Sequence, residues 1–185
     1  MFEFRLPFPP WMSYTLGIMR DSDKLLLKAA TEGNLAAAQA ALRSGASNHA
    51  MTDFGFTALH IAATAGHLQI VQLLVDVGAD IDRRDSTGVS PLLQAVGWPE
   101  IMKVLLAAGA DVDSATKQGV TPLMSAAAFG EIESAHLLIA SGADLNRRDA
   151  GGSSAADIAG EKGEDEIAAL LCGLADQAIN HGGGV

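Results

Sequence analysis

Apolar residues return at intervals of three and four positions along most of this chain, the spacing that places them on one face of a helix. The clearest stripe consists of Ile70, Val71, Leu73 and Leu74. Glycines lie on both sides of it, at Gly66 and Gly78, where a left-handed residue can end a helix. A second short apolar run, 58–63, precedes Gly66. The pattern predicts pairs of short helices whose ends are marked by glycine.

The same pattern returns at a nearly constant interval. Each copy opens with a hydroxyl residue, and these residues are Thr57, Ser90, Thr121 and Ser154. They are 33, 31 and 33 positions apart. A Gly-Ala-Asp triplet returns with matching spacing, starting at Gly78, Gly109 and Gly142. An earlier unit ends at Gly45, so we expect five units, at about 23–51, 52–84, 85–115, 116–148 and 149–175.

The first residues of each unit suit the N-terminus of a helix. The hydroxyl of Thr57 can accept a hydrogen bond from a free backbone N–H. Pro91 and Pro122 occupy the first helical position, where a missing N–H costs nothing. Helices this short are marginal alone, because isolated helices need about 12–15 residues to hold in water. We therefore expect the units to stack on one another, with the stretch 80–88 forming a projecting turn or hairpin.

Several of these elements recur together and in register, and the combination resembles the ankyrin repeat. The second unit carries Gly55-Phe-Thr57-Ala-Leu-His-Ile-Ala-Ala63, then Gly66-His67, then Ile70-Val71-Gln-Leu-Leu74, then Gly78-Ala-Asp80. The resemblance covers 23–175 and implies an all-α solenoid of stacked helix-turn-helix units with projecting β-hairpin or turn loops. It also implies that hairpins and first helices line a concave groove that binds protein partners, while the repeats perform no chemistry.

Two units depart from this pattern. The first has Lys24 where a capping Thr is expected and Ser47 in place of the final Asp, as suits the end of a stack. The third is two residues shorter between its helices, and the shortening places Trp98 in the connecting loop. We expect the deletion to tighten or tilt the stack at that point.

The two ends of the chain differ from the repeats. Residues 1–22 are an aromatic and proline-rich extension, in which Glu3 and Arg5 interrupt the apolar core that a secretory signal needs. Three interpretations of this extension remain open: a cap over the first unit, a disordered peptide or translation artefact, and a docking segment for the partner. Residues 176–185 form a glycine-rich tail.

Composition and charge narrow the class of partner. The chain is 49% hydrophobic and carries a formal net charge of −10, which disfavours nucleic acid and anionic membranes because both are polyanions. No apolar run approaches the roughly 20 residues that span a bilayer. We expect a protein partner with a neutral or basic surface, and a chain that is monomeric by itself. Its one cysteine, Cys172, precludes an internal disulfide, and we expect a cytoplasmic location.

No residue pattern indicates catalysis, a cofactor or a metal site. The resemblance gives His60 a structural role, in which its imidazole ties neighbouring hairpins together by hydrogen bonds, and His67 a similar bracing role. The remaining histidines are scattered without metal-ligand spacing. Cys172 lies in the apolar stripe 170–172, which predicts a buried structural thiol rather than a nucleophile. We therefore expect no enzyme activity.

The resemblance places partner contacts at the hairpin tips and at the groove-facing ends of the first helices. In this chain those positions hold Asp53, Phe54, Phe56, Thr64, Arg83, Arg84, Ser86, Val89, Trp98, Lys117, Gln118, Val120, Phe129, Arg147 and Arg148. The aromatic residues stand out because the fold does not demand them there, and aromatics dominate binding hot spots. For Phe56 and Phe129, packing beneath a neighbouring unit is an equal alternative.

Basic residues repeat at equivalent positions of two hairpins, 83–84 and 147–148. These arginines can bind a carboxylate-bearing strip of a partner. They can equally pair with the carboxylates beside them, which belong to Asp82, Asp85 and Asp149. The sequence leaves both interpretations open.

Two functions of different kinds fit these observations. The first is a non-catalytic adaptor or scaffold that recruits a protein through the concave groove and hairpin tips. The alternative is a dedicated inhibitor or immunity protein that neutralises a toxin or enzyme by blocking its active site. Strong negative charge would speed the capture of a basic target.

Overall fold

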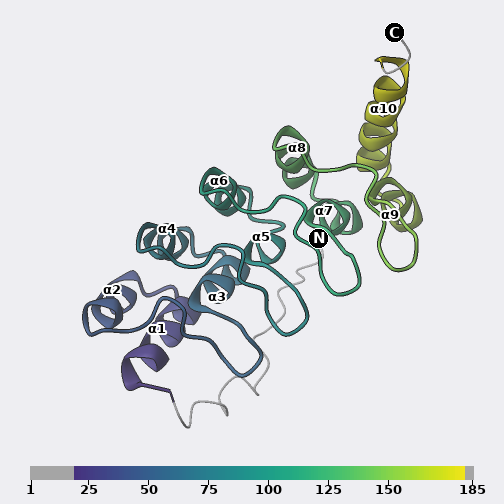
Figure 1. Ribbon diagram of the computed structural model, residues 1–185. Helices are drawn as coiled ribbons and strands as arrows, with labels where there is room; N and C mark the ends of the chain where they lie inside the picture. The colour runs from purple at the N-terminus through teal and green to yellow at the C-terminus, as the bar shows by residue number, and fades with distance from the viewer. Residues whose placement is uncertain (1–18, 182–185) are drawn as a thin grey trace.

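The computed structural model describes residues 19–181, with side chains described through Leu174. In this range the helices are α1 (Asp21–Glu32), α2 (Leu35–Arg43), α3 (Ala58–Ala65), α4 (Leu68–Asp76), α5 (Pro91–Gln94), α6 (Pro99–Ala107), α7 (Pro122–Phe129), α8 (Ile132–Ala140), α9 (Ala155–Lys162) and α10 (Asp165–His181). Figure 1 shows the odd-numbered helices in one row and the even-numbered helices in a second. The predicted all-α solenoid of stacked helix pairs is confirmed.

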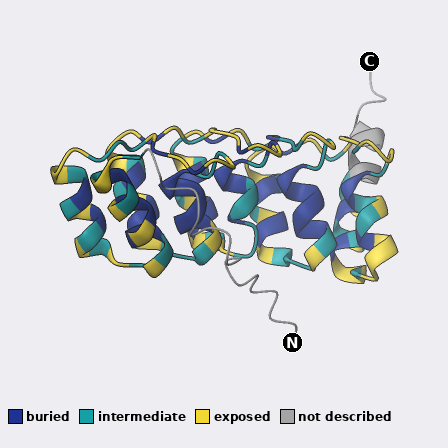
Figure 2. Cartoon of the chain, turned by 90° about the horizontal axis from the view of Figure 1, so that it is seen from below, coloured by how far each residue is buried: buried dark blue, intermediate teal, exposed yellow. Residues whose placement is uncertain are grey.

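Loops connect each helix pair to the next and all project at the same end of the helices. Figure 2 shows them running along one edge of the stack, where most of their residues are exposed. They are turns rather than strands, because the described residues contain a single isolated β-bridge, between Met51 and Thr57. The projecting loops therefore form an edge distinct from the helical body.

Helices begin and end at the residues that the sequence predicts. The side-chain oxygen of each N-cap accepts a hydrogen bond from the backbone N–H three residues later, at 3.2–3.4 Å, in Thr57, Ser90, Thr121 and Ser154. The first helices of the full-length units end at a left-handed glycine, as α3 does at Gly66 with a φ of 77°. Local chemistry thus sets the turn between the two helices of a unit.

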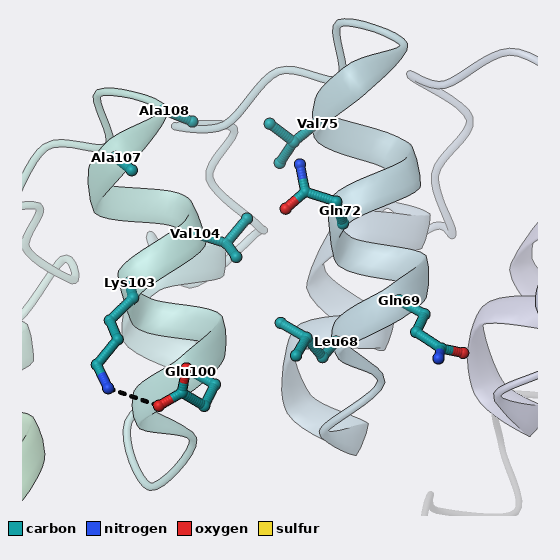
Figure 3. Close-up of a pocket in the computed structure, with 9 residues that line it drawn as sticks. All are labelled: Leu68, Gln69, Gln72, Val75, Glu100, Lys103, Val104, Ala107 and Ala108. Atoms are coloured by element: carbon teal, nitrogen blue, oxygen red, sulfur yellow. Dashed lines mark hydrogen bonds and ion pairs between the residues drawn. The ribbon is translucent and has the colours of Figure 1, made fainter.

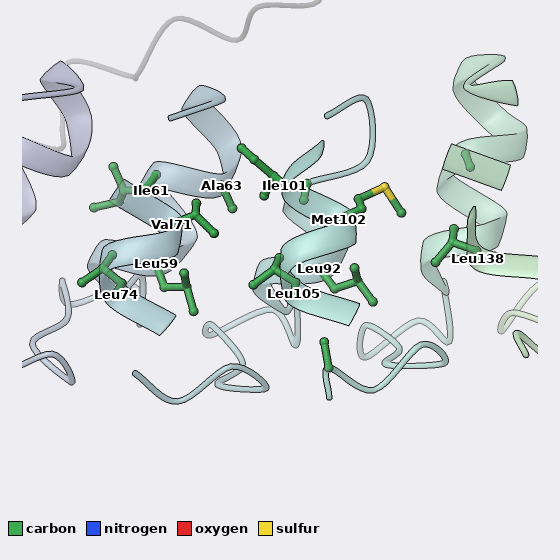
Figure 4. Close-up of a cluster of buried hydrophobic side chains, with 14 of the residues drawn as sticks. Leu59, Ile61, Ala63, Val71, Leu74, Leu92, Ile101, Met102, Leu105 and Leu138 are labelled. Carbon is green, nitrogen blue, oxygen red and sulfur yellow. The ribbon is translucent and has the colours of Figure 1, made fainter. Parts of the chain in front are cut away.

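The core is a continuous layer between the two rows of helices. Leucines from successive helices are fully buried in it (Figure 4), and these are Leu59, Leu74, Leu92, Leu105 and Leu138. Buried alanines such as Ala62 and Ala126 lie among them and let the helices pack closely. Each buried leucine contributes roughly 1.5–3 kcal/mol relative to an exposed one. Neighbouring units share this layer, so the stability of each unit depends on the next.

The third unit shows the effect of its deletion. Its first helix, α5, has 4 residues, whereas α3 and α7 have 8 each. It ends at Ala95 in a right-handed conformation instead of at a left-handed glycine. Trp98 directly precedes α6 and lies in the connection, as predicted.

At the N-terminal end, α1 begins at Asp21, so Lys24 lies inside the helix rather than at its cap. The buried carboxylate of Asp23 accepts hydrogen bonds from Ser47 N at 2.7 Å and from Arg20 at 2.9 Å. Although burial by itself raises the pKa of Asp23, these two donors hold that pKa below its usual value. Asp23 therefore fastens the first helix to its loop. Residues 1–18, and with them most of the predicted N-terminal extension, lie outside the described residues.

At the C-terminal end, α10 continues to His181, past the predicted end of the fifth unit. It packs against α8 and α9, and this side buries Ile167 and Leu171. Cys172 lies on the other side and is exposed, so the prediction of a buried thiol is wrong. None of the described helices is long and apolar enough to cross a membrane.

Candidate functional site

The tips of the four loops form one continuous ridge, which we call the loop ridge and define as residues 50–56, 83–89, 114–120 and 147–153. Each of the last three tips donates a backbone N–H to a carbonyl of the preceding tip. These bonds join Ser86 to Phe54, Lys117 to Thr87 and Ala150 to Gln118, at 2.9, 3.1 and 2.8 Å. Because the tips are linked in series, side chains on the ridge have fixed spacing along the stack.

A buried histidine ties the ridge to the helices below it. Nε2 of His60 donates to the carbonyl of Val89 at 3.1 Å, so Nδ1 is the acceptor for the N–H and hydroxyl of Thr57, at 3.3 and 2.9 Å. Burial lowers the pKa of His60 below its usual value, although the bond to Val89 and the nearby Asp85 oppose that effect. The predicted structural role of His60 is confirmed. His67 braces its neighbour in a similar way, with Nε2 3.3 Å from the carbonyl oxygen of Thr31.

The aspartates of the loops are occupied by backbone groups. Asp85 accepts hydrogen bonds from the N–H groups of Thr87 and Val89 at 2.7 and 2.9 Å. Asp149 accepts from two N–H groups of its own turn, at 2.9 Å each. Asp82 accepts from the N–H of the following loop at 2.9 Å. These carboxylates hold the turns in shape.

None of the arginines beside those aspartates forms an ion pair with Asp82, Asp85 or Asp149, so that interpretation is wrong. Two of them form ion pairs with other carboxylates. Nη2 of Arg84 lies 3.7 Å from Oδ2 of Asp111, and Nη1 of Arg148 lies 3.1 Å from Oδ2 of Asp157. The other two have no carboxylate within 4.0 Å among the described residues; these are Arg83 and Arg147. Both remain available to an external group.

The predicted aromatic contact residues differ in their solvent exposure and in the contacts that they make within the chain. Phe129 is 65% exposed at the end of α7, and Phe54 is 40% exposed on the loop ridge. Phe56 is half-buried, and its ring meets the His60 ring edge-on with centroids 6.1 Å apart. Phe56 therefore packs in part against its own unit, whereas Phe54 and Phe129 present large apolar faces to solvent.

Trp98 has an internal role that the sequence did not reveal. Its indole Nε1 donates to the carbonyl of Thr64 at 3.3 Å, and its ring lies against Gly66. A Cβ atom on Gly66 would lie 2.6 Å from the Trp98 ring. Trp98 is still 39% exposed, so one face braces the preceding unit while the rest of the ring meets solvent.

The predicted contact residues fall into two groups. Twelve lie on the loop ridge: Asp53, Phe54, Phe56, Arg83, Arg84, Ser86, Val89, Lys117, Gln118, Val120, Arg147 and Arg148. Three lie at the opposite end of the helices: Thr64, Trp98 and Phe129. An eight-residue helix spans about 12 Å, so a partner that contacts both groups must cover the length of the first helices.

Sequence reasoning missed an open groove on the row of even-numbered helices, which we call the outer groove. It lies between α4 and α6 and has a volume of about 660 Å³ (Figure 3). Leu68, Val75 and Val104 supply its apolar lining, and an ion pair between Lys103 and Glu100 borders it. The available signal was Leu68, an apolar residue outside the buried stripe of its helix. The groove faces away from the loop ridge.

The described residues contain no group of three or more His, Cys, Asp or Glu side chains that could hold a metal ion. The histidines with hydrogen-bonded rings serve inter-unit contacts, as His60 and His67 do. In the described part of the chain, these side chains hold neighbouring units together.

Comparison with known proteins identifies the repeating units as ankyrin repeats. A family model described as ankyrin repeats (3 copies) matches residues 26–116 and 97–181. The mouse 2-5A-dependent ribonuclease is 40% identical over 76 residues, which are 40% of this chain and 10% of that protein. An ankyrin repeat-containing protein of Schizosaccharomyces pombe is 38% identical over 64 residues, 35% of this chain and 31% of its own length.

A third relative is the mouse protein phosphatase 1 regulatory subunit 27, which is 50% identical over 48 residues, 25% of this chain and 31% of that protein. The chain thus spans between 10% and 31% of the length of these three relatives. The repeat model, by contrast, matches most of the described stack. The chain belongs to the ankyrin repeat family, whose members generally mediate protein–protein interaction.

Proposed function

We propose that this protein is a non-catalytic adaptor or scaffold that holds a protein partner on the loop ridge and on the adjoining surface of the first helices. One observation carries the proposal: a hydrogen-bonded ridge of fixed spacing presents Phe54 and free cationic side chains to solvent, with Phe129 exposed below it. Aromatic residues and arginine dominate binding hot spots. A surface fixed before binding loses little conformational freedom when the partner arrives.

The charge of the whole chain supports a partner that is neutral or basic overall. A formal net charge of −10 repels nucleic acid and anionic membranes, and it attracts a protein of opposite charge over distance. We place the protein in the cytoplasm as a monomer, because a chain with one cysteine makes no internal disulfide and suits a reducing compartment.

Affinity purification with matched variants tests the proposed surface. The tagged protein is compared with the double variant Phe54→Ala/Phe129→Ala and with Leu68→Ala, whose side chain is 39% exposed in the groove between α4 and α6. We expect a stoichiometric partner with the wild type and with Leu68→Ala, and a strong loss with the double variant. If the double variant retains the partner and Leu68→Ala loses it, the partner binds the outer groove and the proposal is wrong.

A dedicated inhibitor is the alternative, and one comparison favours it. A relative that is 50% identical over 48 residues is named as a regulatory subunit of a phosphatase, so a repeat stack of this kind can accompany control of an enzyme. Negative charge would also speed the capture of a basic enzyme. If the captured partner is an enzyme, titration with this protein separates the two functions. Loss of activity that is complete at a one-to-one ratio supports the inhibitor, and unchanged activity supports the adaptor.

A further inference from the structure

The loop ridge differs in charge from the rest of the molecule. It carries five basic residues, Arg83, Arg84, Lys117, Arg147 and Arg148, and three acidic residues, Asp53, Asp85 and Asp149, so its formal charge is +2. The whole chain carries −10, which leaves −12 on the remainder. The ridge is therefore a basic strip on an acidic body.

Three cations of this strip lack an ionic partner within the described part of the chain. Arg83, Lys117 and Arg147 have no carboxylate within 4.0 Å. Among the described residues, the guanidinium of Arg83 donates a hydrogen bond only to the sulfur of Met51, at 3.5 Å, and a thioether is a weak acceptor. The carboxylates nearest to the two arginines in sequence, those of Asp82, Asp85 and Asp149, accept hydrogen bonds from backbone amides. The free donors point to an acceptor that the chain itself does not supply.

We propose that the loop ridge binds an acidic segment of the protein partner, with its carboxylates on Arg83, Lys117 and Arg147. This inference rests on the proposed function and names the chemistry that the ridge recognises. Charge-assisted hydrogen bonds from guanidinium to carboxylate are stronger than neutral ones and can be bidentate. Because the tips are linked by backbone hydrogen bonds, the three cationic side chains extend from fixed backbone positions along the stack.

The ridge also fixes the direction of the bound segment. A shallow hollow between the first two loops is lined by Met51, Thr52, Asp53, Gly55, Arg83, Arg84, Asp85 and Ser86, and the carboxylate of Asp85 is held there by turn amides. Met51 is 41% exposed beside it, so the hollow offers apolar surface next to two guanidinium groups. Lys117 and the arginines of the last loop lie farther along the stack. We therefore infer an apolar side chain at the end of the segment that meets the first loop, followed by carboxylates toward the last loop.

A partner that is neutral or basic overall is compatible with an acidic contact segment. The Debye length is about 8 Å at physiological ionic strength, so electrostatic attraction is strongest near contact. The negative charge of the body attracts a basic partner as it approaches, and the basic ridge then binds the acidic segment once the two proteins touch. A nucleic acid fits less well. Its phosphates follow one another along the whole strand and would lie against the acidic body on either side of a narrow basic strip.

Peptide selection on the full-length protein tests this inference. Peptides are selected from a random library on the immobilised wild type, and their affinities are measured by fluorescence anisotropy. The reversal variant is Arg83→Glu/Lys117→Glu/Arg147→Glu. Its control is Lys28→Glu/Arg43→Glu/Lys162→Glu, which changes the net charge equally at exposed residues away from the ridge. A third variant, Arg83→Gln/Lys117→Gln/Arg147→Gln, removes the three charges without reversing them.

We expect selected peptides with one aromatic or aliphatic residue at one end of a stretch rich in Asp and Glu. Their affinity should fall at least about tenfold in the reversal variant, which corresponds to about 1.4 kcal/mol, and less in the glutamine variant. The control variant should bind nearly as the wild type does, and added salt should weaken wild-type binding. Circular dichroism of each variant verifies that these exposed substitutions leave the fold intact.

Three results would overturn the inference. These are selected peptides without acidic enrichment, equal losses in the reversal and control variants, and displacement of the peptides by a single-stranded oligonucleotide that binds the same cations. If peptides bind through Phe54 and Phe129 regardless of the ridge charges, the acidic segment is wrong and the proposed function stands. If neither the peptides nor the captured partner respond to Phe54→Ala/Phe129→Ala or to the charge reversal, both fail.

Discussion

The first helices of the second and third units, α3 and α5, differ in length but pack into the same core. In the second unit, α3 has 8 residues and ends at Gly66 in the left-handed conformation. In the third, α5 has 4 residues and ends at Ala95 in a right-handed one. The stack nevertheless continues through the third unit, and Leu92 of α5 is as fully buried as Leu59 of α3. A first helix of one turn is enough to keep a leucine in the shared core.

Continuity across the shortened unit comes from contacts between units. His67 meets the carbonyl of Thr31 at 3.3 Å, and Trp98 donates to the carbonyl of Thr64 at the same distance. The tryptophan thus performs in the third unit the bracing that histidine performs in the second. The deletion lies at the end of the helices opposite the loops, and the loop links on both sides of α5 are retained. Helix length can vary there without disturbing the loop ridge.

The largest expected effect comes from shortening one core leucine in each of the two units. Leu59→Ala and Leu92→Ala each remove a fully buried side chain, and we expect losses in the free energy of unfolding of about 2–4 kcal/mol. Leu59→Ala should lie near the upper end, because a capped two-turn helix holds the cavity open. The single turn of α5 can shift into its cavity and reduce the loss. Urea unfolding measures both, and an equal or larger loss for Leu92→Ala would contradict the idea that α5 adapts more easily.

The second test adds a methyl group at the two inter-helix glycines. Gly66 has a φ of 77°, and a Cβ there would lie 2.6 Å from the ring of Trp98, so Gly66→Ala should cost about 2 kcal/mol or more. Gly97 has a φ of 97°, but its Cβ would meet only the flexible carboxylate of Glu131 at 3.4 Å. Gly97→Ala should therefore cost about 1 kcal/mol, from backbone strain alone. Unfolding of both alanine variants in urea gives the difference.

A double-mutant cycle separates strain from steric conflict at Gly66. In a Trp98→Ala background, Gly66→Ala should lose the steric part of its cost and approach the value for Gly97→Ala. If the cost of Gly66→Ala is the same with and without Trp98, the tryptophan does not pack on this glycine in solution.

Much of this fold could be predicted from the sequence because its signals are local. Hydroxyl caps such as Thr57 and stops such as Gly66 act within one turn of the residues that they control. Their recurrence therefore predicted the five units and the short third one. The resemblance to a known repeat then placed His60 in its inter-hairpin contact correctly.

The wrong predictions concern features that depend on contacts between residues far apart in the sequence. The exposure of Cys172 depends on which side of α10 meets α8 and α9, and a stripe of apolar letters does not show that. The arginines of the loops lie beside aspartates in sequence, yet Arg84 reaches Asp111 in the next loop. The outer groove likewise depends on how far apart α4 and α6 pack. The sequence predicted which residues are candidates for binding, but it did not show their existing partners.

The third test uses pH, because the buried His60 of the second unit has an uncharged counterpart in the third. Burial lowers the pKa of His60 in the folded state, so the folded protein binds this proton less readily than the unfolded chain does. The contribution of His60 is fully present above the unfolded pKa of about 6.5 and is lost as the pH falls below it toward the lower folded value. The third unit has Leu93 at the equivalent position and carries no such dependence.

We therefore expect stability to fall between pH 7.5 and pH 5.5, by no more than about 1.4 kcal/mol per pH unit from this one proton. The variant His60→Gln keeps a polar side chain that does not titrate, and it should flatten the curve over this range. Urea unfolding at several pH values measures both proteins. If the two curves remain parallel, the pKa of His60 is the same in the folded and unfolded states and another group is responsible for the pH dependence.

The smallest effect concerns the indole N–H of Trp98. Trp98→Phe keeps an aromatic ring beside Gly66 but removes the donor to the carbonyl of Thr64, so we expect a loss of about 1 kcal/mol in urea unfolding. Trp98→His restores a ring nitrogen like that of His67 and should recover part of the loss. The carbonyl of Thr64 is near solvent, and water can replace the indole in the phenylalanine variant. This replacement keeps the expected loss below that of any core truncation. If the histidine variant is no more stable than the phenylalanine variant, the contact is made by ring packing alone, and the parallel between the two units fails at this position.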